Sequence, residues 1–189
     1  MNTNFVIKKY FDKSVYLFKP KKFIDKRGFF SEVYNYEYFK NIINIKEKFV
    51  QDNYSFSKSI GTIRGLHLQK NPYSQAKLIR VLNGKIQDVI VDVRKKSKTY
   101  GKTYSFTLSK KNEFQLYIPS GFAHGFCTLE KNTEVLYKAS KYYYPKSETT
   151  ILWSDKDLKI KWKVDLKKVI VNEKDSKGIN FNQYKNYKK

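Results

Sequence analysis

The stretch Ile63-Arg64-Gly65-Leu66-His67-Leu68-Gln69, followed shortly by Gln75-Ala76-Lys77-Leu78-Ile79-Arg80, is the most informative part of this chain. Its charged and polar side chains interleave with Ile and Leu at close to the two-residue period of strands that have one apolar face. It contains one of only two histidines and two of only four arginines. Polar groups that point inward from adjacent strands line a pocket, so we place the chemistry of the protein here.

Short strands at roughly ten-residue spacing follow this stretch. The Asn83-Gly84 pair predicts a hairpin turn, and residues 85–93 alternate again. Further strands are predicted at residues 103–108, 113–119, 125–129 and 133–140. Many short strands with few helices indicate an antiparallel sandwich or a small barrel.

The segment before this stretch is predicted to form strands and one helix. We expect strands at residues 15–23, 29–34 and 50–55, a turn at residues 25–28, and a helix at residues 36–48. After Trp162, strand-like alternation recurs at residues 169–171, and residues 180–189 are left unassigned. The length of 189 residues suits one domain with a substantial core.

The formal charge of +22 raises the question of nucleic-acid binding. Only four of the 39 basic residues are arginine, the side chain that recognises bases and phosphates by paired hydrogen bonds. The lysines are also spread along the whole chain. We therefore expect no nucleic-acid partner, although the charge should help an anionic substrate to approach.

The single cysteine, Cys127, cannot form an intramolecular disulfide, which suits a reducing compartment. The N-terminus has no basic-then-apolar signal pattern, and no apolar run approaches the ~20 residues needed to span a bilayer. We expect a cytoplasmic protein that does not contact a membrane.

The sequence contains few residues that could bind a metal ion or act as a nucleophile. With two histidines and one cysteine, only a site of His67, His124 and a carboxylate is conceivable, and we predict no metal. Cys127 sits in an apolar strand, as a core thiol does. The sequence has no glycine-rich dinucleotide fingerprint and no phosphate loop.

General acid–base chemistry remains. His67 is the natural base, because the ordinary pKa of histidine lies near physiological pH. A carboxylate on its other ring nitrogen would fix the tautomer, and Lys77 could stabilise a developing oxyanion. A buried tyrosine could return a proton from the opposite side.

Several motifs together resemble the dTDP-4-dehydrorhamnose 3,5-epimerase family. Beside the opening stretch, they are Asp25-Lys26-Arg27-Gly28-Phe29-Phe30, Phe49-Val50-Gln51-Asp52-Asn53, Ile118-Pro119-Ser120-Gly121-Phe122-Ala123-His124-Gly125-Phe126, Leu136-Tyr137-Lys138 and Tyr142-Tyr143-Tyr144-Pro145. The resemblance covers roughly residues 10–178 in order. It implies an all-β, cupin-like antiparallel jelly-roll with short peripheral helices. We expect a single domain over residues 1–189, with a core at about 49–162, N-terminal strands at about 10–48 and a C-terminal extension at about 163–189.

The resemblance also implies a function: a homodimeric, cofactor-independent epimerase that inverts C3, C5 or both in a nucleotide-diphosphate-linked 4-keto-6-deoxy sugar. Such an enzyme would serve the biosynthesis of a surface polysaccharide, that is, a lipopolysaccharide or a capsule. The family favours a dTDP-linked hexose. Departures at Asn172, Lys163 and residues 153–156 leave a GDP-linked heptose open.

Site residues follow from the resemblance position by position. His67 matches the base, Tyr137 the general acid and Lys77 the oxyanion partner, whereas Asp175, or alternatively Asp155, would hold the histidine. The residues that match substrate-binding positions are Arg27, Glu32, Gln51, Asn53, Arg64, His124, Glu148 and Lys174, of which Arg27 and Glu32 could reach a neighbouring subunit. The other hypotheses are a nucleotide-sugar 3,4-ketoisomerase, a non-catalytic carbohydrate- or nucleotide-binding cupin module, and a metal-dependent cupin.

Overall fold

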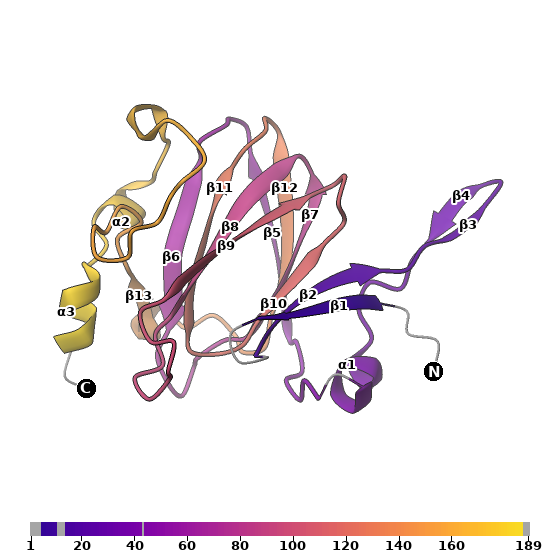
Figure 1. Cartoon of the computed structure of the whole chain (residues 1–189), viewed down its shortest axis with the longest axis horizontal. Coiled ribbons are helices and arrows are strands. Elements are labelled where there is room, and N and C mark those ends of the chain that lie inside the picture. The colour runs from indigo at the N-terminus through magenta and orange to yellow at the C-terminus, as the bar shows by residue number, and fades with distance from the viewer. Residues whose placement is uncertain (1–4, 11–13, 43, 187–189) are drawn as a thin grey trace.

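The computed structural model describes residues 5–10, 14–42 and 44–186. Its strands form two large antiparallel sheets and one small hairpin (Figure 1). The six-stranded sheet has the order β1 (Phe5–Tyr10), β2 (Val15–Pro20), β10 (Gln115–Ile118), β7 (Lys77–Asn83), β12 (Thr133–Ala139) and β5 (Gln51–Ser57). The five-stranded sheet has the order β13 (Glu148–Thr150), β6 (Ile63–Gln69), β11 (Phe122–Thr128), β8 (Lys85–Asp92) and β9 (Thr103–Ser109).

The two sheets face each other and bury the central core between them. This core joins Ile79 and Val81 of β7 to Ile86 and Ile90 of β8 and to Phe126 of β11. The predicted jelly-roll of antiparallel strands is confirmed. Among the described residues, no helix is long and apolar enough to cross a membrane.

Other segments cover the outer face of the five-stranded sheet and part of that of the six-stranded sheet. On the five-stranded sheet, Leu66 and Leu68 pack against Leu158 and Phe181 from the C-terminal segment. Strand β8 is almost entirely buried because it is central and both of its faces are covered. The covering segment matters for the site, because it carries Asp175.

The Asn83-Gly84 turn is present, but it does not close a two-stranded hairpin. It joins β7 of the larger sheet to β8 of the smaller one, so the chain turns a corner between the sheets. Gly84 has a φ of +76°, and a Cβ there would meet the side chain of Thr133 at 2.4 Å. Glycine is therefore required at this corner.

The predicted helix at 36–48 is shorter in the structure, where α1 spans Tyr36–Ile42. Asn35 caps its start through a hydrogen bond from the amide of Tyr38. Asn44 adopts a φ of +62°, and the amide of Ile45 donates to the carbonyl of Phe39 at 2.9 Å. This left-handed C-terminal turn ends the helix, while Ile45 stays buried and continues the apolar pattern.

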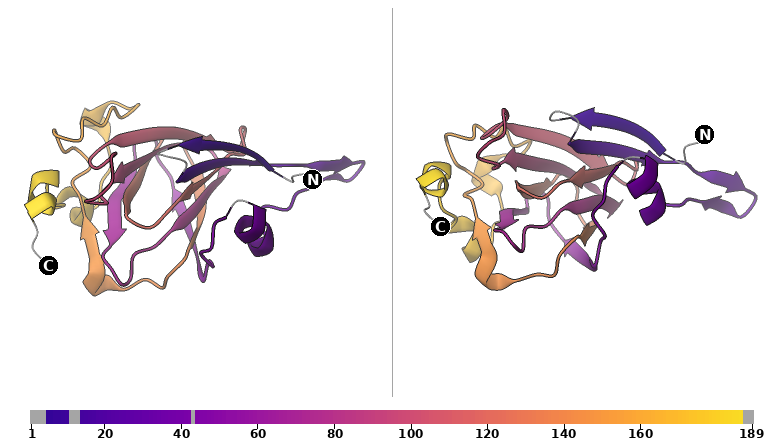
Figure 2. Two further views of the ribbon diagram at one scale, coloured as in Figure 1. Left: turned by 60° about the horizontal axis from the view of Figure 1, so that its bottom comes forward. Right: turned by 90° about the horizontal axis from the view of Figure 1, so that it is seen from below.

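A hairpin of β3 (Phe23–Asp25) and β4 (Gly28–Phe30) extends away from the two sheets, at the end of the molecule opposite the C-terminus (Figures 1 and 2). The turn predicted at residues 25–28 is therefore confirmed, but the strand predicted at 29–34 ends at Phe30. All three residues of each strand are exposed, so the described part of the chain does not bury the segment enough to extend the pairing.

The C-terminal segment is mostly helical turns. It contains η1 (Pro145–Ser147) before β13, then η2 (Leu166–Lys168), α2 (Glu173–Ser176) and α3 (Phe181–Asn186). The strand-like pattern at residues 169–171 gives only one isolated parallel bridge, between Ile170 and Thr62. Asp165 instead accepts a hydrogen bond from Lys167 and starts the helical turn that precedes it.

Candidate active site

A cleft opens between the sheets where β6, β7 and β12 approach one another. An inner cavity of about 140 Å³ and an outer one of about 340 Å³ share His67, Lys77 and Tyr137 in their linings. The cleft therefore has these three side chains at its centre. All of the predicted site residues line one cavity or the other, except Arg27 and Glu32.

His67 forms a short hydrogen bond with Asp175. Nε2 of the imidazole lies 2.6 Å from Oδ1 of the carboxylate, and the Asp175 side chain is 1 % exposed. The other carboxylate oxygen accepts from the amide of Gly65 at 2.9 Å. Burial alone would raise the pKa of Asp175, but the bonds from His67 and Gly65 lower it overall. An ionised carboxylate accepts the proton on Nε2, which leaves the lone pair on Nδ1.

Glycine at position 65 is needed for this arrangement. Its φ is +117°, and a Cβ on it would lie 2.6 Å from the Cα of Gly125 in β11. The two strands approach so closely because both positions are glycine.

Asp175 is brought to His67 by the one-turn helix α2. Asn172 begins that helix, and its side chain accepts a hydrogen bond from the backbone amide of Asp175 at 2.7 Å. The alternative partner, Asp155, has a different role. Its two carboxylate oxygens accept from the amides of Leu158 and Phe181, at 3.1 and 2.6 Å, and so hold the C-terminal segment together. Asp155 is therefore not the partner of His67.

Lys77 lies in the cleft as a buried ammonium group. Burial lowers its pKa to about 8, while the charges of Asp88 and Glu148 oppose the shift. A lysine with this pKa is still largely protonated at neutral pH. Because it is poorly solvated, its charge acts strongly on a nearby oxyanion.

A second imidazole–carboxylate pair lies deeper in the fold. Nε2 of His124 is 2.9 Å from Oδ2 of Asp88, and both side chains are buried. Burial lowers the pKa of His124 despite the charge of Asp88. Oδ1 of Asp88 is buried and has no hydrogen-bond partner among the described residues. Sequence reasoning missed Asp88 as a site residue, although its carboxylate lies in the middle of a strand whose apolar residues predict burial.

Tyr137 faces the cleft from β12. Burial raises the pKa of its phenol, and the positive charge of Arg64 partly opposes that shift. The phenol is therefore protonated at neutral pH and can donate a proton. Arg64 is held at the inner cavity by hydrogen bonds to the carbonyl of Phe56 and the hydroxyl of Ser57.

The outer cavity is lined by a polar network. Glu148 accepts hydrogen bonds from Lys174 at 2.6 Å and from the Tyr143 hydroxyl at 2.7 Å. On the opposite strand, the side chain of Gln51 donates to that of Asn53 at 2.8 Å. Among the described residues, no three His, Cys, Asp or Glu side chains are grouped so that they could hold a metal ion.

Comparisons with known proteins agree with this geometry. The profile of the dTDP-4-dehydrorhamnose 3,5-epimerase family matches residues 13–183. The chain belongs to this family. It is 46 % identical over 167 residues to the dTDP-4-dehydrorhamnose 3,5-epimerase of Shigella flexneri, covering 88 % of this chain and 91 % of that one.

Solved structures of family members superpose closely on this one. The dTDP-4-dehydrorhamnose 3,5-epimerase of Elizabethkingia anophelis has a TM-score of 0.92 and 42 % identity, covering 98 % of this chain and 100 % of that one. A Legionella pneumophila epimerase in complex with dTDP-4-keto-L-rhamnose has a TM-score of 0.88 and 37 % identity, covering 94 % of this chain and 93 % of that one. The predicted family, fold and isomerase class are thus confirmed, and the chain is a nucleotide-sugar epimerase.

Two of the residues expected from the family resemblance lie away from the cleft of this epimerase. Arg27 is exposed in the turn of the hairpin and pairs with Asp25 at 2.6 Å. Glu32 follows the hairpin and accepts a hydrogen bond from Asn35. The structure does not bring either residue to His67 of the same chain.

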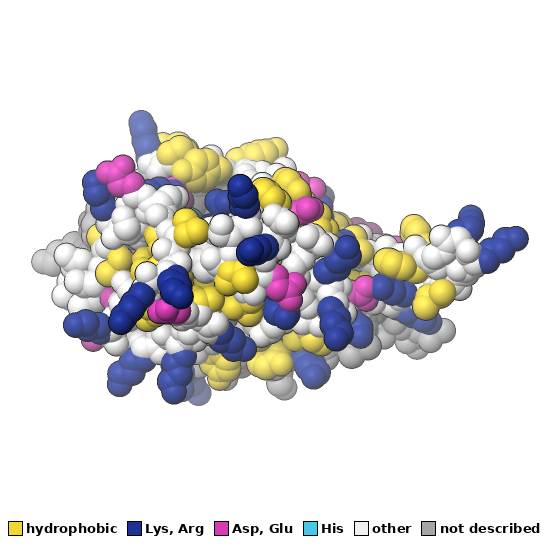
Figure 3. Space-filling view, turned by 90° about the horizontal axis from the view of Figure 1, so that it is seen from above, with side chains coloured by type: hydrophobic (Ala, Val, Ile, Leu, Met, Phe, Trp, Pro, Cys, Tyr) yellow, Lys and Arg dark blue, Asp and Glu magenta, His cyan; other side chains and the backbone are white. Residues whose placement is uncertain are grey.

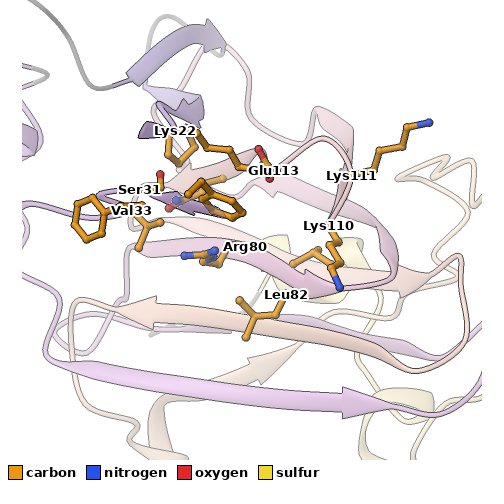
Figure 4. A pocket seen from close by; sticks show the side chains of 13 residues that line it. Lys22, Ser31, Val33, Arg80, Leu82, Lys110, Lys111 and Glu113 are labelled. Carbon is orange, nitrogen blue, oxygen red and sulfur yellow. Dashed lines mark ion pairs between the residues drawn. The ribbon is translucent and has the colours of Figure 1, made fainter. Parts of the chain in front are cut away.

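A larger hollow, of about 720 Å³, lies beside the hairpin (Figure 4). Arg80 and Leu82 of β7 line it, and Lys22 pairs with Glu113 across its upper part (Figure 4). Its described lining contains no histidine and no tyrosine, and its one carboxylate is already paired. The hollow therefore lacks the acid–base groups that the cleft has.

Proposed function

We propose that this epimerase inverts C3 and C5 of a dTDP-linked 4-keto-6-deoxy-hexose. The observation that carries the proposal is the pairing of His67 with Asp175 in a cleft that also holds Lys77 and Tyr137. The ketone at C4 makes the hydrogens on both neighbouring carbons acidic. The substrate is already oxidised, so the inversion needs only proton transfer.

In each inversion, Nδ1 of His67 removes the proton from the carbon beside the ketone. The C–H electron pair forms the C=C bond of an enolate, and the carbonyl pair moves to O4. The ammonium group of Lys77 stabilises that negative oxygen, and Asp175 stabilises the imidazolium. Tyr137 then gives a proton to the opposite face of the carbon, which inverts the centre.

The nucleotide would occupy the outer cavity and its rim. The diphosphate needs cations, which Arg64 and Lys174 supply, and the base needs hydrogen-bond partners such as Gln51 and Asn53. The remaining positions, His124 and Glu148, would contact the sugar–phosphate end. The formal charge of +22 favours the approach of such a dianion.

We further propose that the enzyme works as a homodimer in the cytoplasm. The exposed hairpin would then place Arg27 and Glu32 at the nucleotide in the cleft of the neighbouring subunit. This accounts for two predicted substrate-binding residues that lie outside the cleft of their own chain. The product would serve the synthesis of a lipopolysaccharide or a capsule.

Proton exchange in deuterium oxide tests the reaction. With dTDP-4-keto-6-deoxy-glucose, deuterium should enter both C3 and C5, and His67→Asn should abolish the exchange. The GDP-linked analogue serves as the comparison for the base. A 3-keto product seen by NMR would instead identify a 3,4-ketoisomerase, and no exchange with either sugar nucleotide would reject the assignment.

A further inference from the structure

A second hollow, a groove of about 830 Å³, lies outside the active cleft. Its walls are the loop of residues 70–74, residues 93–96 after β8, and Tyr184 of α3. Only Leu68 and Gln69, at the end of β6, line both this groove and the outer cavity of the cleft. The groove is therefore a neighbour of the cleft, separated from it by the end of one strand.

Four basic side chains converge on the groove: Lys70, Arg94, Lys95 and Lys96. Its described lining contains no Asp or Glu. On the face shown in Figure 3, by contrast, basic side chains lie among hydrophobic and acidic ones. Like charges that gather around a hollow repel one another, and an anion bound between them would relieve this repulsion.

The basic side of the groove is held in a fixed shape by Asp92. This buried carboxylate accepts from Arg94 Nη2 at 2.7 Å and from the hydroxyls of Ser97 and Thr99, both at 2.6 Å. The amide of Ser97 also donates to the carbonyl of Arg94 at 2.8 Å. Asp92 offsets the charge of Arg94, whereas Lys95 and Lys96 stand exposed in the middle of the turn. The backbone on this side of the groove therefore loses little conformational entropy when a ligand binds.

Part of the remaining lining of the groove is apolar. Leu68, Val93 and the ring of Tyr184 line it beside the cations. A volume in the range of small-molecule sites, with cations beside an apolar and aromatic wall, fits a ligand that has both phosphates and a ring. We propose that this groove binds a phosphate-bearing ligand of nucleotide size, with its phosphates on Lys95 and Lys96 and its ring against Tyr184.

Such a ligand would touch the loop that borders the active cleft. The side chain of Gln69 donates to the carbonyl of Tyr73 at 2.7 Å and accepts from the amide of Tyr144 at 2.7 Å. It therefore ties the groove loop to the segment that carries Tyr143, which lines the outer cavity. The occupied groove would hold the mouth of the cleft in place.

Titration calorimetry on the full chain tests the proposal with two probes, inorganic pyrophosphate and ADP, in an Arg64→Ala/Lys174→Ala background that removes the cations expected to hold a diphosphate in the cleft. Lys95→Glu/Lys96→Glu should weaken the binding of both probes at least tenfold, equivalent to about 1.4 kcal/mol. Lys98→Glu/Lys102→Glu is the matched control, because it makes the same charge change at exposed positions nearby that do not line the groove. It should leave the affinity within about twofold.

Two further variants identify the site and the ring contact. In that background, Tyr184→Ala should remove the advantage of ADP over pyrophosphate, and the chain with Arg64 and Lys174 restored should keep the groove affinity within about twofold. The proposal is overturned if pyrophosphate shows no saturable binding in the Arg64→Ala/Lys174→Ala background, or if both lysine double variants weaken it equally. ADP binding no tighter than pyrophosphate would reject the nucleotide-sized ligand. Every one of these results is independent of whether the epimerase reaction is assigned correctly.

Discussion

Nε2 of His67 and Oδ1 of Asp175 lie 2.6 Å apart, although 108 residues separate them in the chain. The carboxylate fixes the proton on Nε2 and so keeps the lone pair on Nδ1. In Asp175→Asn the side-chain amide would donate to Nε2 and reverse this tautomer. We expect the turnover number to fall by about 10³- to 10⁴-fold, as when the tautomer of a catalytic histidine is lost.

Asp155→Asn is the matched control, because Asp155 is equally a buried aspartate of the C-terminal segment. It should lower the free energy of unfolding by about 1–3 kcal/mol, since the amide of Phe181 loses a charged acceptor. Turnover of the folded fraction should stay near that of the wild type. Steady-state kinetics with denaturant unfolding separates the two variants, and equal losses of turnover would contradict the pairing.

Asn172 is expected to position Asp175 without itself reacting. Asn172→Ala removes the cap of α2 at a cost of about 1 kcal/mol and frees the backbone of Asp175. Turnover should fall about tenfold with little change in KM, because the carboxylate is misplaced and the substrate contacts are kept. Asn172→Ser keeps a capping oxygen and should restore most of the turnover. A serine variant as slow as the alanine variant would rule out this role.

We expect Lys77, whose pKa burial lowers to about 8, to set the alkaline limit of activity. The ammonium form is needed to stabilise the enolate, so kcat/KM should be high below pH 8 and fall as the pH rises through that value. Lys77→Met should remove this alkaline limb along with most of the activity. The pH profile of kcat/KM measures both effects, and a wild-type profile that stays flat to pH 10 would be inconsistent with the assignment.

Asp88 is expected to affect the pH at which the alkaline limb of kcat/KM falls. Its negative charge raises the pKa of Lys77, so Asp88→Asn should move the alkaline limb to lower pH. Asp157→Asn, which changes an exposed carboxylate outside the cleft, should leave the limb in place. The comparison of the two profiles isolates the charge beneath the cleft from any general effect of charge.

Tyr137→Phe keeps the base and the oxyanion partner but removes the phenolic proton. Deuterium should still enter the substrate from solvent, because His67 can remove a proton and return it to the same face. Formation of the inverted product should fall by about 10²- to 10⁴-fold. Parallel measurement of exchange and product by NMR tests this, and full inversion by the variant would exclude Tyr137 from the mechanism.

The sequence predicted the strands well because their alternation is a local property. The sequence predicted the structure less well wherever it depends on contacts between residues far apart in the chain. Asp175 and Asp155 both lie in plausible local motifs, and only the packing of the C-terminal segment decides between them. The residues Asn83-Gly84 clearly predict a turn, but they do not determine whether the next strand joins the same sheet.

Burial of polar groups was the other source of error. Asp88 lies in a strand where apolar and polar residues alternate, so its place behind His124 depended on which face points inward. The helix at residues 36–48 looked longer because Ile45 continues the apolar pattern, yet the backbone turns at Asn44. In both cases, tertiary contacts gave the residue a different environment from the one that the local sequence pattern predicts.

The segment after β13 supplies both a cover for the smaller sheet and the carboxylate for His67, so we expect reactivity to depend on its having been made and folded. A nascent chain that has not yet reached α2 can build all the strands, but its imidazole has no partner and Leu66 and Leu68 lack their cover. We therefore expect the enzyme to become competent to remove a proton only after α2 has been made and has packed against β6. We expect a chain truncated before α2 to be inactive and prone to aggregation, because apolar residues of the smaller sheet stay exposed.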